Sequence, residues 1–245
     1  MSVPRLFSLI ILFTLSHNVW AEPLTFSSGK IRVNLLELYT SEGCSSCPPA
    51  DKWFRRLVKN PDLWNNIVPV VFHVDYWDYL GWKDKFARPE FASRQEIYSR
   101  KGYVSSVYTP GVMLNGRGWR GWRVMKNAPV KNDKTPGKLK ATLENNALNV
   151  SFSPETIVTD DLVLNVALLS GNIKNKIKAG ENHGETLAHD FIVVKHIKKS
   201  STDNANWQLK NLITEKLNYS PYAIAIWLDK KNDPTPIQAT GRWLN

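Results

Sequence analysis

Residues 33–51 read VNLLELYTSEGCSSCPPAD, and this stretch decides how the first half of the chain is interpreted. Residues 33–40 form a short apolar run rich in strand-forming side chains, which ends at a Ser-Glu-Gly turn signal. From residue 48 onward, apolar side chains recur at helical spacing, and two prolines occupy the first turn, where a missing N–H costs little. The stretch therefore predicts a buried strand that leads into a helix at Cys44 and Cys47.

Cys44 and Cys47 are the only cysteines of the chain, and their spacing favours redox chemistry over cross-linking. A disulfide that closes a loop of about four residues contributes only about 1.9 kcal/mol of stability, against about 4.7 kcal/mol for a loop of 100 residues. The start of a helix favours a thiolate, the form of cysteine that attacks disulfides, and the hydroxyls of Ser45 and Ser46 can donate to it. We therefore expect thiol–disulfide exchange with protein thiols or disulfides, and no cofactor.

Further along the chain, a second apolar run at residues 67–74 predicts a strand, and residues 87–103 predict a helix. Thr109 and Pro110 follow that helix and precede a strand-like run and an Asn-Gly turn. In a redox fold of this kind, a cis proline beside the disulfide leaves the preceding backbone free to pair with an extended substrate. Thr109, Pro110, Ser45 and Ser46 are therefore predicted to contact substrate, together with Trp77 from an aromatic run at residues 76–82.

Four blocks of the sequence resemble the signature blocks of a bacterial family of secreted, thioredoxin-like proteins that is catalogued as a domain of unknown function. The blocks are ELYTSEGCSSCPPAD (37–51), HVDYWDYLGWKDKFA (73–87), YTPGVMLNGR (108–117) and GENHGETLAH (180–189). The resemblance implies a member of the thioredoxin superfamily, with Cys44 as the attacking thiol, Cys47 as the resolving thiol and Pro110 as the cis proline. Asp75, late in the second predicted strand, is the candidate for a buried acid near the pair.

The second half of the chain predicts a different architecture. Residues 118–142 are polar and rich in lysine and arginine, and beyond them short β-type runs recur with turn signals between them and no convincing helix. We expect an α/β thioredoxin-like domain at residues 30–125, a linker at 126–140 and an all-β sandwich domain at 141–245.

The N-terminus predicts export. An arginine precedes an uncharged run, and the small residues at positions 19 and 21 fit cleavage of a signal peptide of residues 1–21. The apolar core of that segment is too short to span a bilayer, and no later segment approaches about 20 uncharged apolar residues, so no transmembrane segment is expected after cleavage. We expect a secreted protein of the bacterial periplasm with a redox partner in the cell envelope.

The net charge of +10 does not indicate nucleic-acid binding, because the lysines and arginines are scattered and an exported protein rarely meets nucleic acid. A solvated basic surface accounts for it, and attraction to anionic envelope lipids or acidic partners is the alternative.

Two alternatives to an oxidoreductase stay open. Cys44, Cys47 and His73, with Met113, have the soft ligand atoms that select Cu(I), so the chain can also be interpreted as a copper-delivery protein. A non-catalytic binding module with a vestigial cysteine pair is the other alternative. Glu181, His183 and His189 form a weaker candidate group for binding an ion.

Overall fold

The computed structural model describes residues 22–128, 132–157, 161–201, 205–213, 219 and 222–244. The predicted signal peptide lies outside these residues. The strands are β1 (Leu24–Ser27), β2 (Asn34–Thr40), β3 (Ile67–His73), β4 (Gly111–Leu114), β5 (Arg117–Gly118), β6 (Gly137–Glu144), β7 (Ala147–Pro154), β8 (Leu162–Ser170), β9 (Ile173–Lys176), β10 (Thr186–His189), β11 (Ile192–Ser200), β12 (Asn206–Leu209), β13 (Ala223–Lys230) and β14 (Asp233–Trp243). The α-helices are α1 (Pro48–Arg55) and α2 (Pro89–Arg100), and short 3₁₀ turns cover Arg56–Lys59, Asp78–Leu80 and Gly121–Arg123.

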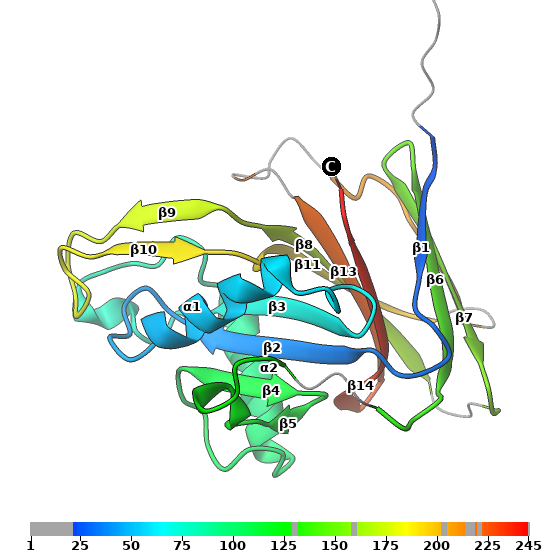
Figure 1. The fold of residues 1–245 in the computed structure, drawn as a ribbon, viewed down its shortest axis with the longest axis horizontal. Helices are drawn as coiled ribbons and strands as arrows, with labels where there is room; N and C mark the ends of the chain where they lie inside the picture. The colour runs from blue at the N-terminus through cyan, green and yellow to red at the C-terminus, as the bar shows by residue number, and fades with distance from the viewer. Residues whose placement is uncertain are drawn as a thin grey trace, which may run out of the picture.

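An eight-stranded sheet in the order β14-β13-β8-β11-β3-β2-β4-β5 runs through the molecule (Figure 1). β2 and β3 are parallel, and every residue of both strands is buried, which explains their nearly continuous apolar sequences. β3 also pairs in parallel with β11, at Val71 and Ile192, and the Val71 N–H donates to the Phe191 carbonyl at 2.9 Å. This pairing joins strands from the two halves of the sequence in one sheet.

The predicted fold class, an α/β thioredoxin-like domain followed by an all-β sandwich, is therefore wrong. The described part of the chain contains fourteen strands and two α-helices, and the largest sheet contains strands from both halves of the sequence. The sequence pattern identified most of the strands but not their partners, because hydrogen bonding between strands is not encoded locally. β6 begins at Gly137, inside the segment 126–140 that was predicted as a linker.

A smaller sheet, in the order β1-β6-β7-β12, packs against one face of β8 and β13. Alternate residues of β13 serve two cores: Ile224 and Ile226 face the smaller sheet, whereas Ala225 and Trp227 belong to the core around β2 and β3. β9 and β10 form a separate two-stranded ribbon, and β10 runs beside α1 (Figure 1).

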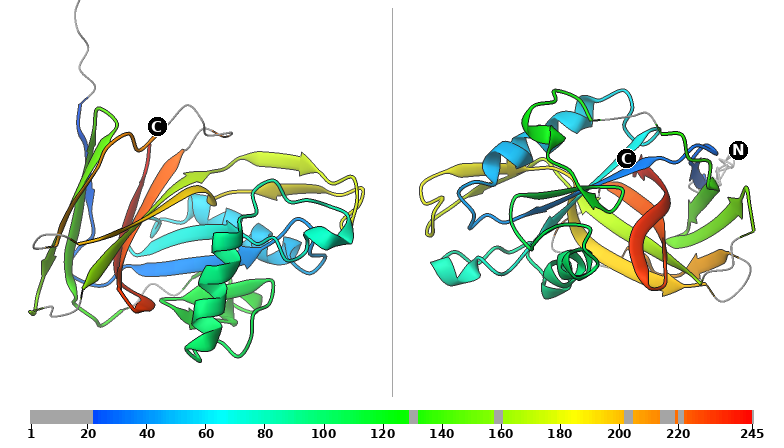
Figure 2. Two further views of the ribbon diagram at one scale, coloured as in Figure 1. Left: turned by 180° about the vertical axis from the view of Figure 1, so that it is seen from behind. Right: turned by 90° about the horizontal axis from the view of Figure 1, so that it is seen from below.

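The two helices lie on opposite faces of the large sheet (Figure 2). α1 buries Trp53 and Phe54, and α2 buries Phe91 and Tyr98. Both helices were predicted from the sequence, and both carry proline in the first turn as expected. In the part of the chain that is described, neither helix is long and apolar enough to cross a membrane.

A buried arginine ties α2 to both halves of the large sheet. Arg94 is 1% exposed and donates to both carboxylate oxygens of Glu37 on β2, at 2.8 and 3.2 Å. It also contacts Asp229 on β13 at 3.3 Å and the Tyr98 hydroxyl at 2.9 Å. Burial raises the pKa of Asp229 to about 7, although the adjacent Arg94 acts in the opposite direction. Because a buried charge is tolerated only when it is paired, these contacts act as a unit.

We predict that Arg94→Ala lowers the free energy of unfolding by about 3–5 kcal/mol, since it leaves two buried carboxylates without their cation. Urea unfolding followed by circular dichroism measures this. Arg100→Ala is the matched control on the same helix, because its ion pair with Glu96 is exposed, and it should change stability by less than about 0.5 kcal/mol. Equal effects of the two substitutions would contradict the assigned role of Arg94.

Candidate functional site

Cys44 and Cys47 form a disulfide in the loop between the end of β2 and the start of α1. Cys47 is the N-cap of α1, and its carbonyl accepts the N–H groups of Ala50 at 2.9 Å and Asp51 at 3.2 Å. The first two helical positions are prolines, which have no N–H. The first turn of α1 therefore offers the sulfurs little backbone hydrogen bonding, and polar side chains have to supply it.

Thr109 and Ser46 supply those contacts to the Cys44 sulfur. The Thr109 hydroxyl donates to Cys44 Sγ at 3.2 Å, and Ser46 Oγ lies 3.4 Å from the same sulfur. The indole Nε1–H of Trp77 donates to Thr109 Oγ1 at 2.7 Å. The indole N–H occupies a lone pair of this oxygen, which leaves the Thr109 proton available to the sulfur.

Both sulfurs are shielded from solvent. Cys44 is 1% exposed and Cys47 is fully buried, whereas Ser45 and Ser46 between them are exposed. The peptide bond between Thr109 and Pro110 is cis, and Pro110 is buried. A disulfide partner can therefore reach Cys44 only after its surroundings open locally.

A segment from the second half of the chain holds the loop that carries the cysteines. The Asn182 side chain donates to the backbone carbonyls of Glu42 at 2.9 Å and Cys44 at 3.0 Å. Next to it, Glu181 accepts the backbone N–H of Ser45 at 3.0 Å, which lowers the pKa of the exposed Glu181 carboxyl. The site is thus built from both halves of the sequence.

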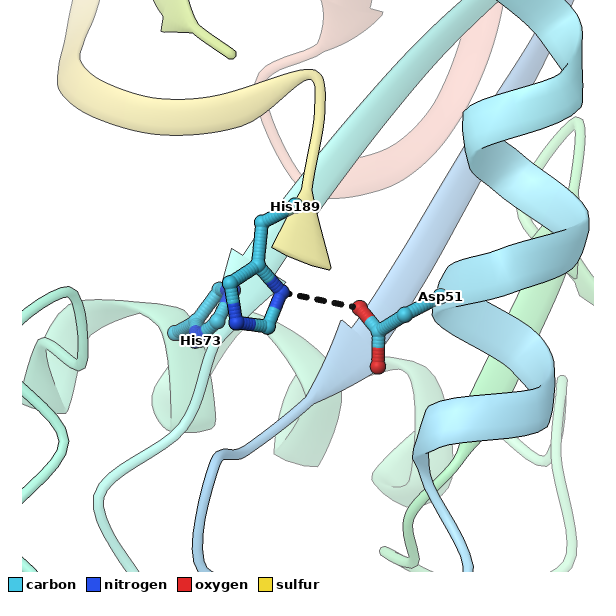
Figure 3. A group of neighbouring side chains, drawn as sticks. All are labelled: Asp51, His73 and His189. Atoms are coloured by element: carbon cyan, nitrogen blue, oxygen red, sulfur yellow. Dashed lines mark ion pairs between the residues drawn. The ribbon is translucent and has the colours of Figure 1, made fainter. Parts of the chain in front are cut away.

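Five buried titratable side chains lie close to the disulfide loop: Glu42, Asp51, His73, Asp84 and His189. His189 Nε2 lies 3.2 Å from Glu42 Oε1, and His189 Nδ1 lies 3.6 Å from Asp51 Oδ1 (Figure 3). Neither contact has the angular geometry of a hydrogen bond. His73 Nδ1 lies 2.7 Å from Asp84 Oδ2, and its ring is 5.0 Å from that of His189.

The charges in this cluster support one another. Burial opposes the charged form of His189, but its contacts with Asp51 and Glu42 outweigh burial and raise its pKa to about 9. Burial alone would raise the pKa of Glu42, but His189, Asn175 and Trp82 lower it below its ordinary value. Asp84 follows the same pattern, with burial opposed by His73, and its pKa is also lowered.

The structure brings some of the predicted site residues together and separates others. Thr109, Ser46 and Trp77 meet at Cys44, whereas Ser45 contacts Glu181 instead of the sulfur. His73 is grouped with Asp51 and His189, the side chains in the described part of the chain that are close enough to share an ion.

Three other predicted residues lie apart from these groups. Asp75 is half-buried and begins a turn, where its carbonyl accepts the Asp78 N–H. Met113 lies on β4, paired with Glu37. His183 is exposed, unlike the buried His189.

Sequence analysis missed the contributions of Asp51, Asp84 and Asn182. Asp51 lies three residues before the buried Phe54 and so shares its helix face, a signal that an acid points inward. Nothing in the sequence places Asn182 beside Cys44, because the two are 138 residues apart.

Residues 35–229 match the model of a family described as "Protein of unknown function (DUF1223)". The chain belongs to this family. Among the curated proteins, none matches the chain.

Two solved structures are similar to it. One, a protein from Agrobacterium tumefaciens, is 24% identical with a TM-score of 0.65, and the match covers 87% of this chain and 96% of that one. The other, HBP35 of Porphyromonas gingivalis, is 11% identical with a TM-score of 0.55, covering 86% of this chain and 75% of that one. At these identities the likeness concerns the fold alone.

We predict that Asn182→Ala lowers the free energy of unfolding of the disulfide-bonded protein by about 2 kcal/mol, because two carbonyls of the cysteine loop lose their donor. Urea unfolding measures the change. His183→Ala, at the exposed neighbouring position, should alter stability by less than about 0.5 kcal/mol. An Asn182→Ala protein as stable as that control would show that the contact does not hold the loop.

Proposed function

We propose that the protein is a thiol–disulfide oxidoreductase that acts on protein thiols or disulfides in the bacterial periplasm, after removal of residues 1–21. The observation that carries the proposal is the hydroxyl of Thr109, which is oriented by Trp77 and donates to Cys44 Sγ. A structural disulfide has no need of a donor directed at one sulfur. A thiolate at Cys44 gains from it, since hydrogen bonds to charged groups are the stronger ones.

The proposed reaction is an exchange of sulfur–sulfur bonds. In the reduced protein, the Cys44 thiolate attacks a substrate disulfide; a mixed disulfide forms, and the departing substrate thiolate takes up a proton from solvent. The Cys47 thiolate, after losing its proton, attacks the Cys44 sulfur. The mixed disulfide breaks, the second substrate thiol leaves, and the Cys44–Cys47 bond is restored. The substrate is thereby reduced by two electrons and the protein is oxidised by two, and the reverse sequence oxidises a substrate dithiol.

An asymmetry between the two sulfurs supports the proposed roles. The polar contacts described at the sulfurs, from Thr109 and Ser46, are both to Cys44. Both cysteines are buried, but Cys47 is the N-cap residue of α1. Cys44 therefore suits attack on a substrate, and Cys47 suits resolution of the mixed disulfide within the protein.

We predict that the Cys44–Cys47 pair equilibrates reversibly with glutathione buffers, with a potential between about −120 and −270 mV. Alkylation of free thiols followed by mass spectrometry gives the fraction reduced at each buffer ratio. A pair that stays oxidised below about −300 mV would instead be a structural disulfide, and the proposed function would fail.

We predict that Thr109→Val slows the alkylation of Cys44 in the reduced protein about tenfold at pH 7. Valine keeps the branched shape but removes the donor, and a hydrogen bond to a charged group contributes about 1.5–3 kcal/mol. Iodoacetamide labelling, located by peptide mass spectrometry, measures the rate. Ser45→Ala is the control, because it removes a neighbouring hydroxyl that bonds Glu181 and not the sulfur. Equal rates in the two variants would remove Thr109 from the proposed mechanism.

A further inference from the structure

We propose that Asp51, His73 and His189 bind a divalent first-row metal ion of the Zn²⁺ class. The three side chains come from α1, the end of β3 and the end of β10, and Figure 3 shows His189 pointing toward Asp51 with His73 beside the His189 ring. One ligand atom from each lies within 4.8 Å of the others. This site uses neither sulfur, so it does not rest on the proposed exchange reaction, and it shares only His73 with the copper alternative.

His73 is positioned by an outer carboxylate, as metal-ligating histidines are. Its Nδ1 lies 2.7 Å from Asp84 Oδ2, so Nε2 is the ring nitrogen left to coordinate an ion. His73 is 0% exposed, and among the described residues Nε2 has no hydrogen-bond partner. A buried polar atom without a partner costs about 1–3 kcal/mol, and coordination of an ion by Nε2 would satisfy it.

The other two ligands are oriented in the same way. Asp51 Oδ2 accepts the Thr40 hydroxyl at 2.9 Å, while Oδ1 is the atom nearest His189 Nδ1. On the far side of the ring, His189 Nε2 lies beside Glu42. His73 and Asp51 are thus each hydrogen-bonded by an outer partner, the arrangement that positions metal ligands in proteins, and His189 Nε2 lies 3.2 Å from a carboxylate oxygen of Glu42.

Charge balance also favours a cation. The cluster contains three buried carboxylates, on Glu42, Asp51 and Asp84, and two imidazoles. Three ionised carboxylates give the cluster an excess of negative charge in a buried space, where unbalanced charge is costly. A divalent ion would compensate two of these three charges.

The dimensions suit a small ion with nitrogen and oxygen ligands. Zn²⁺ binds such atoms at about 2.0–2.2 Å, so two ligands of a tetrahedral ion lie about 3.3–3.6 Å apart. Ligand atoms that lie within 4.8 Å of one another therefore need to approach by up to about 1.5 Å. Three protein ligands would leave one position of a tetrahedral ion for water.

The test is titration of the full-length, tag-free protein with Zn²⁺ by calorimetry, with Co²⁺ as the spectroscopic probe. The protein is first stripped by chelator and kept in the disulfide form, so that the thiols cannot bind metal. We expect one ion per chain and the visible absorption of tetrahedral Co²⁺. His73→Ala should weaken binding about 100-fold or more, and the isosteric Asp51→Asn at least about tenfold.

His183→Ala is the matched control, since it removes an exposed histidine from the same segment as His189 and should bind the ion with unchanged affinity. The double variant Cys44→Ser with Cys47→Ser should also keep binding, which separates this site from the redox function. Absence of saturable binding by the unaltered protein would overturn the proposal. Should His73→Ala fail to fold, Asp51→Asn decides: undiminished affinity in that variant would overturn it as well.

Discussion

The parallel pairing of β3 with β11 is the constraint on which the rest of the structure depends. Buried backbone groups must be paired, and the bond from the Val71 N–H to the Phe191 carbonyl closes the central sheet across the two halves of the chain. Because His189 precedes Phe191 by two residues, the same pairing places its ring against Asp51 on α1. The position of the histidine beside the cysteine loop is thus a consequence of sheet continuity.

Buried charged side chains make the pairing between the two halves of the chain specific. Arg94 pairs with Glu37 on β2 and with Asp229 on β13, and His189 lies between Glu42 and Asp51. A one-residue slip of β13 would turn Asp229 to the opposite face of the sheet and leave Arg94 with one carboxylate fewer. Misregistered pairings therefore carry a penalty that apolar packing alone would not impose, because hydrophobic contacts are non-directional.

Local features of this chain are readable from its sequence, and long-range ones are not. The apolar run before Cys44 and the prolines after Cys47 specify β2 and α1 directly. The fold class was mispredicted because β8, β11 and β13 have ordinary strand sequences that carry no mark of their partners. Asp75 was chosen as the buried acid because it follows a strand, which is a local signal. The acids that are buried are Asp51 and Glu42, and their burial depends on β10 and on Asn175, which lie far from them in the sequence.

Residues from the second half of the chain are consequently part of the site around the cysteines. Asn182 holds two carbonyls of the loop that carries Cys44, Glu181 holds the N–H of Ser45, and His189 faces the carboxylates on either side of the cysteines. Since the backbone from Glu42 to Ser45 is anchored by this segment, a movement of that backbone must break these contacts or carry the segment with it. Any exposure of Cys44 that moves the cysteine loop is therefore coupled to the stability of the segment around Asn182.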